Sequence, residues 1–240
     1  MNNSYLKSVY TLSPGVLQID SFSYNDQKRI ASFGQYVTNA GNNYFVRMDF
    51  NFSGNNVLPD SYLYTDNGNN QETHQLTFDG QGRIVKDTCA TSKFVTYYNY
   101  SGNYAICTVL FEGTMDDAQV DSLLLTDGNF TGEKIWSTDN GTWQKQGDVV
   151  YGHATAANPG YKAEISASVG PLLYVLSVNN FGGWSDYISK SILNKVTGVA
   201  DGLPTGGFNY SIKLDGTGRV SGLTPVGVPA GTAEINYNYY

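Results

Sequence analysis

The chain has 240 residues, a formal net charge of -7 and only 15% charged residues, well below the roughly 25% of an average soluble domain. This composition excludes a coiled coil or a long helical bundle, and the 14% of aromatic residues argues against disorder. No apolar run is long enough for a membrane-spanning helix. The acidic balance argues against a nucleic-acid partner, because phosphate binding needs clustered Lys and Arg.

Alternation of apolar and polar residues predicts β-strands along most of the chain. Tyr44, Val46 and Met48 would share one face of a strand, with Arg47 on the other face. Turns rich in Asn, Asp and Gly recur between such segments at hairpin spacing. We therefore predict an all-β fold with a minor α part, a single domain over residues 1–240. Its strands would form an antiparallel β-meander, either an open curved sheet or a partly closed barrel.

One segment departs from this alternation. Ser185 can cap a helix, and Ile188 and Ile192 follow it near helical spacing. We predict a short helix at about residues 185–197, within an insertion at residues 152–207. The insertion would cover one face or one end of the sheet, or simply complete the core.

Three heptapeptides share the order apolar, Asx, two variable residues, Gly, Arg and a β-branched residue. The Asx side chain can accept backbone N–H groups of a hairpin turn, and the Gly can take a positive φ at a bulge. The Arg can then lie across a neighbouring aromatic ring. In the first copy Lys28 replaces the Gly, so that turn is expected to be strained. The predicted turn residues are Asn25 and Arg29 in the first copy, Asp79, Gly82 and Arg83 in the second, and Asp215, Gly218 and Arg219 in the third.

A second repeated element accompanies these turns. The segments 50–55 and 98–103 both read aromatic-Asn-aromatic-Ser-Gly-Asn, and residues 237–239 repeat the first part. Together these motifs resemble the YD (Rhs-type) repeat and a Bacteroidetes family of uncharacterised secreted lipoproteins with degenerate YD-like repeats. The resemblance implies export, a lipid anchor through a Cys lost with the signal peptide, and no known enzymatic activity. It brings no catalytic residues.

The N-terminal residues 1–5 lack the basic and apolar regions of a signal peptide. The chain is therefore either cytosolic or an exported protein whose signal peptide has been removed. Little Lys and Glu with abundant Asn, Gly, Thr and Tyr favours export, to the periplasm or the outer-membrane surface.

Two cysteines, Cys89 and Cys107, are too few for a disulfide framework. A two-residue turn at Ser101 and Gly102 would place Cys107 opposite Thr96, so a bridge to Cys89 would need another register. Two unpaired thiols in the core are the simpler interpretation.

No motif for catalysis or metal binding is recognisable. His74 and His153 lie far apart in the sequence, no Gly-x-Ser-x-Gly segment exists, and the Cys and His spacing is not that of a zinc site. Nothing marks out the carboxylates Asp49, Glu112, Asp116 and Asp117. We expect no catalytic residue, no metal and no cofactor.

Trp136, Trp143 and Trp184 are candidate ligand-binding residues, because exposed aromatic rings beside Asn and Asp can stack on sugars. The alternative is that they pack in the core or in cross-strand pairs. The leading hypothesis is a non-catalytic, exported cell-envelope protein that acts as a structural or binding module, with a glycan or another envelope protein as partner. The alternatives are a carbohydrate-binding surface protein of a polysaccharide-uptake system, and an exported hydrolase with two carboxylates facing each other in a cleft.

Overall fold

The computed structural model describes residues 5–54, 56–67, 70–115, 118–139, 141–157, 189, 191–200, 203–227 and 234–239. Among these residues it has sixteen β-strands, one short 3-10 helix (Phe111–Gly113) and no α-helix. No helix in these ranges is long and apolar enough to cross a membrane. The strands are β1 (Leu6–Ser13), β2 (Val16–Tyr24), β3 (Ile30–Asn39), β4 (Asn42–Asn51), β5 (Ser61–Asp66), β6 (Asn70–Phe78), β7 (Ile84–Cys89), β8 (Phe94–Ser101), β9 (Tyr104–Leu110), β10 (Ala118–Thr126), β11 (Asn129–Asp139), β12 (Thr142–Ala157), β13 (Ser191–Ala200), β14 (Leu203–Leu214), β15 (Val220–Val226) and β16 (Glu234–Tyr239).

The strand order is that of a closed antiparallel barrel. Each strand neighbours the next one along the chain, and β1 also pairs with β16, from Leu6 opposite Tyr239 to Leu12 opposite Glu234. Closure leaves no sheet edge unpaired in this order. The predicted all-β antiparallel meander is confirmed, and of its two forms the closed one is present.

The predicted helix at residues 185–197 is wrong where the structure describes it. Residues from Ser191 onward belong to β13, which pairs with β12 through Val196 opposite Tyr151 and Leu193 opposite His153. The β-branched Ile192, Val196, Thr197 and Val199 suit a strand, and the last three have direct partners on β12. The other residues of the predicted helix lie outside the described ranges, apart from Ser189. Both ends of the predicted insertion at 152–207 are likewise strand: β12 continues to Ala157, and β14 begins at Leu203.

The chain divides into two compact units, which are described separately. Unit 1 comprises residues 1–73 and 208–240, and unit 2 comprises residues 74–207, so the boundary falls within β6 and β14. In each unit the strand register places the core residues on one face. The core of unit 1 includes Val9, Phe22, Phe33, Val46, Met48 and Tyr62. The core of unit 2 includes Ile84, Tyr98, Ala105, Cys107, Val109, Leu123 and Phe130.

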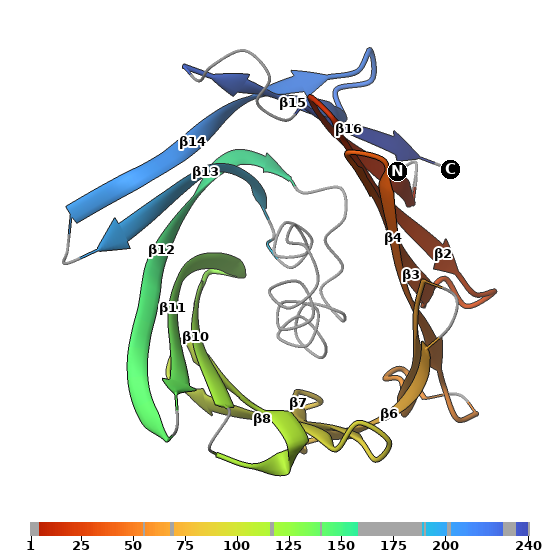
Figure 1. Cartoon of the computed structure of the whole chain (residues 1–240). Helices are drawn as coiled ribbons and strands as arrows, with labels where there is room; N and C mark the ends of the chain where they lie inside the picture. Colours follow the sequence, from red (N-terminus) through yellow and green to blue (C-terminus); the bar gives the residue numbers. More distant parts are fainter. Residues whose placement is uncertain are drawn as a thin grey trace. The chain divides into compact units, whose positions relative to one another are not determined.

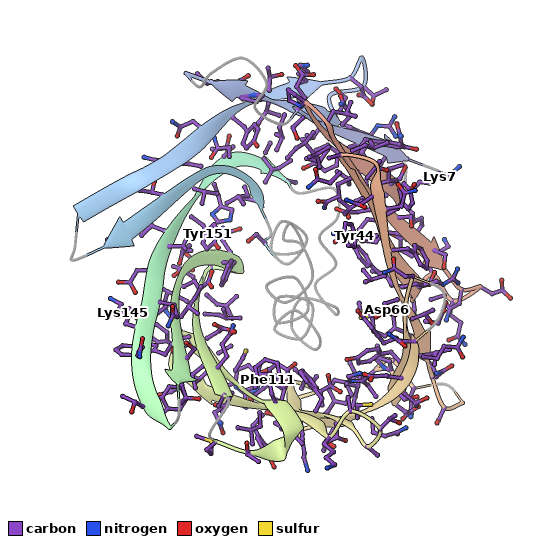
Figure 2. The ribbon with its side chains drawn as sticks, viewed as in Figure 1. Lys7, Tyr44, Asp66, Phe111, Lys145 and Tyr151 are labelled. Carbon is purple, nitrogen blue, oxygen red and sulfur yellow. The ribbon has the colours of Figure 1, made fainter. Side chains whose placement is uncertain are left out.

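The sheet of unit 2 is curved, and its two faces differ in character. Strands β8 and β10 to β13 follow one another around the curve (Figure 1). Tyr151 and Phe111 lie on the concave side and Lys145 lies on the convex side (Figure 2). Because cross-strand partners share a face, the buried apolar residues of unit 2 lie on the concave side with Tyr151.

The β8–β9 hairpin has a different register from the one expected. Ser101 pairs with Tyr104, so the turn is Gly102-Asn103, and Cys107 lies opposite Tyr98 rather than Thr96. Gly102 takes a positive φ of 56° there. Cys89 and Cys107 are both free and buried.

The three repeated heptapeptides form three turns with one geometry. In the β6–β7 turn, Asp79 Oδ1 accepts the backbone N–H groups of Gln81 and Arg83, each at 2.9 Å, and Gly82 has φ 75°. These hydrogen bonds lower the pKa of Asp79, and the bond from the Arg83 backbone N–H has the largest effect. The β2–β3 and β14–β15 turns repeat the pattern with Asn25 and Arg29, and with Asp215 and Arg219.

Each turn arginine also lies over an aromatic ring of the second repeated element. The guanidinium carbon is 5.6 Å from the ring centre for Arg29 over Phe52, 4.3 Å for Arg83 over Tyr100 and 4.8 Å for Arg219 over Tyr239. The Tyr100 hydroxyl donates to the Ile84 carbonyl at 2.9 Å, which ties β8 to the residue after Arg83. The two repeated motifs are therefore two halves of one structural unit, because the arginine of the first packs on the aromatic residue of the second.

Candidate functional site

Trp136 and Trp143 lie together on the convex face of unit 2. Trp136 of β11 pairs with Lys145 of β12, and Trp143 precedes Lys145 by two residues, so both indoles share the face on which Lys145 lies (Figure 2). The two residues are 37% and 41% exposed. Of the three predicted tryptophans, these two are therefore brought together, and Trp184 lies outside the described residues.

A third exposed ring continues this face across the sheet. Tyr97 of β8 pairs with Thr108, Thr108 pairs with Val120, and Val120 pairs with Trp136, so the four residues form one cross-strand row. Neighbouring strands are about 4.8 Å apart, which places Tyr97 and Trp136 roughly 14 Å apart along the row. We call Tyr97, Trp136 and Trp143 the aromatic surface.

Charged groups lie beside these rings. The Lys86 ammonium is 5.4 Å from the centre of the Tyr97 ring. Lys145 forms an ion pair with Asp148 at 2.7 Å next to Trp136. The aromatic surface therefore offers flat apolar rings flanked by hydrogen-bonding groups, a combination suited to a ligand with both apolar faces and hydroxyl groups.

Two carboxylates are buried on the concave face of unit 2. Asp121 is 0% exposed and Glu133 is 5% exposed. Gln119 Nε2 donates to both Asp121 oxygens, at 3.1 and 2.8 Å, and the Tyr151 hydroxyl donates to Glu133 Oε2 at 2.8 Å. Burial raises the pKa of Asp121 to about 6 and that of Glu133 to about 7. Sequence reasoning missed this pair, because their strands also carry many apolar residues and neither carboxylate sits in a motif.

A serine and a histidine also meet in unit 2. Ser189 Oγ accepts the Phe130 backbone N–H at 2.9 Å and lies 3.1 Å from His153 Nε2. Burial lowers the pKa of His153. Ser189 is itself buried, so a dissolved substrate could not reach this hydroxyl.

A set of metal-ligating side chains converges where β6 meets β7. His74 pairs with Cys89 across the two strands, and Glu72 lies two residues before His74 on the same face of β6. The ligand atoms of these three residues all lie within 4.8 Å of one another. His74 Nδ1 is 3.0 Å from Asp87 Oδ1, and both groups are buried. No spacing rule for zinc sites reveals this set, but the bulge after Gly82 fixes the register that places His74 opposite Cys89.

The carboxylates considered from the sequence are not part of these sites. Asp49 is bound by Arg47 in an exposed pair, with Nε 2.8 Å from Oδ2. Asp116 and Asp117 lie outside the described residues, and so does the side chain of Glu112.

Comparison of this chain with known proteins shows a similarity of fold only. No family model and no curated protein matches the chain, so the resemblance to YD-repeat lipoproteins stays a prediction. A porin-like protein from Bacteroides uniformis is 11% identical, with a TM-score of 0.58 over 98% of each chain. A porin-like protein from Bacteroides vulgatus is 13% identical, with a TM-score of 0.57 over 98% of this chain and 99% of that one. Both are described only as porin-like, a description that names no enzymatic activity. The chain thus shares the fold of porin-like proteins from two Bacteroides species.

Proposed function

We propose that this protein is a non-catalytic, exported binding module of the bacterial cell envelope that takes a glycan on its aromatic surface. The observation that carries the proposal is the pair of exposed indoles, Trp136 and Trp143, side by side on the β11–β12 hairpin. Trp and Tyr are enriched at binding surfaces, because their rings combine a flat apolar face with a polar edge. The envelope location is supported by a composition typical of exported proteins and by the porin-like proteins from Bacteroides that share this fold.

Charged residues on the convex face of unit 2 support exposure of this face to water. Membrane barrels carry an apolar outer face and a polar inner face. In unit 2 the concave side carries the buried Asp121 and Glu133 beside its apolar core, and the convex side carries Val120 and Trp136 beside charged residues. Its convex side carries Lys134, Lys145 and Asp148 on β11 and β12. A lysine facing lipid at the bilayer midplane costs about 2–4 kcal/mol, so the aromatic surface is proposed to face water at the periplasm or the outer-membrane surface.

The burial of the two carboxylates in unit 2 supports a binding role rather than hydrolysis. The carboxylates that burial perturbs most strongly, Asp121 and Glu133, are withdrawn from solvent. A glycosidase needs two carboxyl groups flanking a bound sugar. A polysaccharide chain cannot lie between groups that solvent does not reach.

The test is binding to a glycan array, followed by affinity electrophoresis with each polysaccharide that binds. Trp136→Ala and Trp143→Ala should each weaken binding roughly 5- to 30-fold, because loss of one stacking partner of this size costs on the order of 1–2 kcal/mol. Tyr44→Ala is the matched control, because Tyr44 is 37% exposed but belongs to unit 1; its binding should match the unsubstituted chain.

Two outcomes would refute the glycan proposal. One is an array without any bound glycan, which would favour the purely structural role. The other is equal loss of binding in the Tyr44 variant and the tryptophan variants, which would place the ligand elsewhere.

A further inference from the structure

We propose that Glu72, His74 and Cys89 form a binding site for a zinc ion at the β6–β7 hairpin. This site is separate from the aromatic surface, and the proposal does not depend on the glycan-binding function. The three side chains supply a carboxylate oxygen, a ring nitrogen and a sulfur, which are the ligand types that zinc uses in proteins.

Local strand geometry brings these side chains together. His74 and Cys89 are direct cross-strand partners, and such partners have their Cβ atoms about 4.5–5.5 Å apart on one face. Glu72 and His74 are alternate residues of one continuous strand, so their side chains leave the same face. The site therefore depends on one hairpin, whose register the Asp79–Arg83 turn holds.

The distances are close to those of an occupied site. The three ligand atoms lie within 4.8 Å of one another. Zinc bonds of about 2.0–2.3 Å in a tetrahedron place ligands roughly 3.3–3.8 Å apart. Side-chain rotations that move the ligand atoms by about an ångström close this difference. A water molecule can supply the fourth ligand, as in zinc sites with three protein ligands.

Asp87 is a positioning residue for this site. Its Oδ1 lies 3.0 Å from His74 Nδ1 in a fully buried pair. Zinc-binding histidines ordinarily donate their second ring N–H to a carboxylate, which fixes the tautomer and makes the other nitrogen a better ligand. A buried His–Asp pair alone does not indicate a metal, because such a pair can simply form a hydrogen bond within a core. The convergence of a thiol and a second carboxylate on the same imidazole points instead to a cation.

The second cysteine provides the matched control. Cys107 is free and buried like Cys89, but it lies on β9 opposite Tyr98. Burial raises the pKa of the Cys107 thiol, which disfavours the thiolate that a metal needs. Zinc bound to Cys89 would also protect that thiol from oxidation outside the cytoplasm.

The experiment is titration of the metal-free full-length chain with CoCl2 and with ZnCl2 under reducing conditions. Cobalt should produce a thiolate-to-cobalt charge-transfer absorption band that zinc then removes, and zinc should raise the temperature of thermal unfolding. Cys89→Ser should abolish the band, whereas Cys107→Ser should leave it unchanged. Asp87→Asn should keep the band but weaken zinc binding about 10–100-fold, and Glu72→Gln should also weaken zinc binding. Circular dichroism of each metal-free variant checks that the fold is retained.

Three results would overturn the zinc site. They are no cobalt band in the unsubstituted chain, a band that survives Cys89→Ser, and a band lost equally in the Cys107 variant. The Cys107 comparison also separates the loss of a metal ligand from general damage to the core, because both substitutions replace a buried thiol with a hydroxyl.

Discussion

Replacing Glu133 by Gln should change how the stability of the chain depends on pH. Glu133 is buried on β11, its Oε2 accepts the Tyr151 hydroxyl at 2.8 Å, and its Oε1 has no hydrogen-bond partner. A glutamine keeps the size and can still accept the Tyr151 hydroxyl, but it cannot ionise. The variant therefore isolates the cost of charging this one buried group.

Burial raises the pKa of Glu133 from 4.5 to about 7. A group whose pKa is raised in the folded state binds its proton more tightly there than in the unfolded chain. Its stabilising contribution is complete below about pH 4.5 and is lost as the pH rises through about 7. At 1.36 kcal/mol for each pKa unit, the loss is about 3 kcal/mol.

The assay is urea unfolding of both chains at pH 4.5, 6, 7.5 and 9, followed by tryptophan fluorescence at constant ionic strength. The quantity compared is the difference in unfolding free energy between the original chain and the Gln variant. Taking this difference removes the pH-dependent contributions of other titrating groups. One of these is His153, whose lowered pKa makes stability rise with pH in an overlapping range. The Gln variant should gain about 3 kcal/mol relative to the original chain between pH 4.5 and pH 9. A difference that stays constant within about 1 kcal/mol would refute the reasoning, since one pKa unit corresponds to 1.36 kcal/mol.

Three further predictions concern the repeated turns, and each is checked by urea unfolding near pH 7. Gly218→Ala should lower the unfolding free energy by about 1–2 kcal/mol, because Gly218 has φ 81°. Gly216→Ala, in the same turn and equally free of neighbouring atoms, should have little effect; equal effects of the two would contradict the conformational explanation. Arg83→Ala should lower the unfolding free energy by about 1–2 kcal/mol, because it removes both the contact with Tyr100 and the Asp79 ion pair. Arg47→Ala breaks only an exposed pair with Asp49 and should change it by less than about 1 kcal/mol, so a larger effect there than at Arg83 would be evidence against the stacking argument. Lys28→Gly should raise the unfolding free energy by up to about 1 kcal/mol, because Lys28 holds φ 63° where the other two turns have Gly; a loss of stability would show that its contact with Tyr5 outweighs the backbone strain.

Much of the fold could be predicted from the sequence, because its determinants are local. Alternation in segments such as Tyr44 to Phe52 gives strands, and Asx-Gly turns give antiparallel hairpins. The Asp79 and Asp215 turns depend on hydrogen bonds that span only two to four residues. The same reasoning failed at Ile192 and Val196, whose spacing fits either a helix or a strand until a partner strand is known.

The candidate sites were harder to predict from the sequence, because their residues come together only through the strand register and the curvature of the sheet. Trp136 and Trp143 stand out as rare residues in the sequence, but only the pairing of β11 with β12 places both on one exposed face. Asp121 and Glu133 look like ordinary strand carboxylates until the direction of curvature shows that their face is buried. His74 and Cys89 meet because a bulged turn shifts the register by one residue.

The amino-acid sequence by itself determined the antiparallel hairpins and the geometry of their turns, since neighbouring residues make those hydrogen bonds. The closing of β1 on β16 was decided by the tertiary structure, and so was the choice of which face of each strand is buried. Alternation divides a strand into two faces without saying which one is concave. That choice follows from the curvature of the assembled sheet, and it separates the exposed tryptophans from the buried carboxylates.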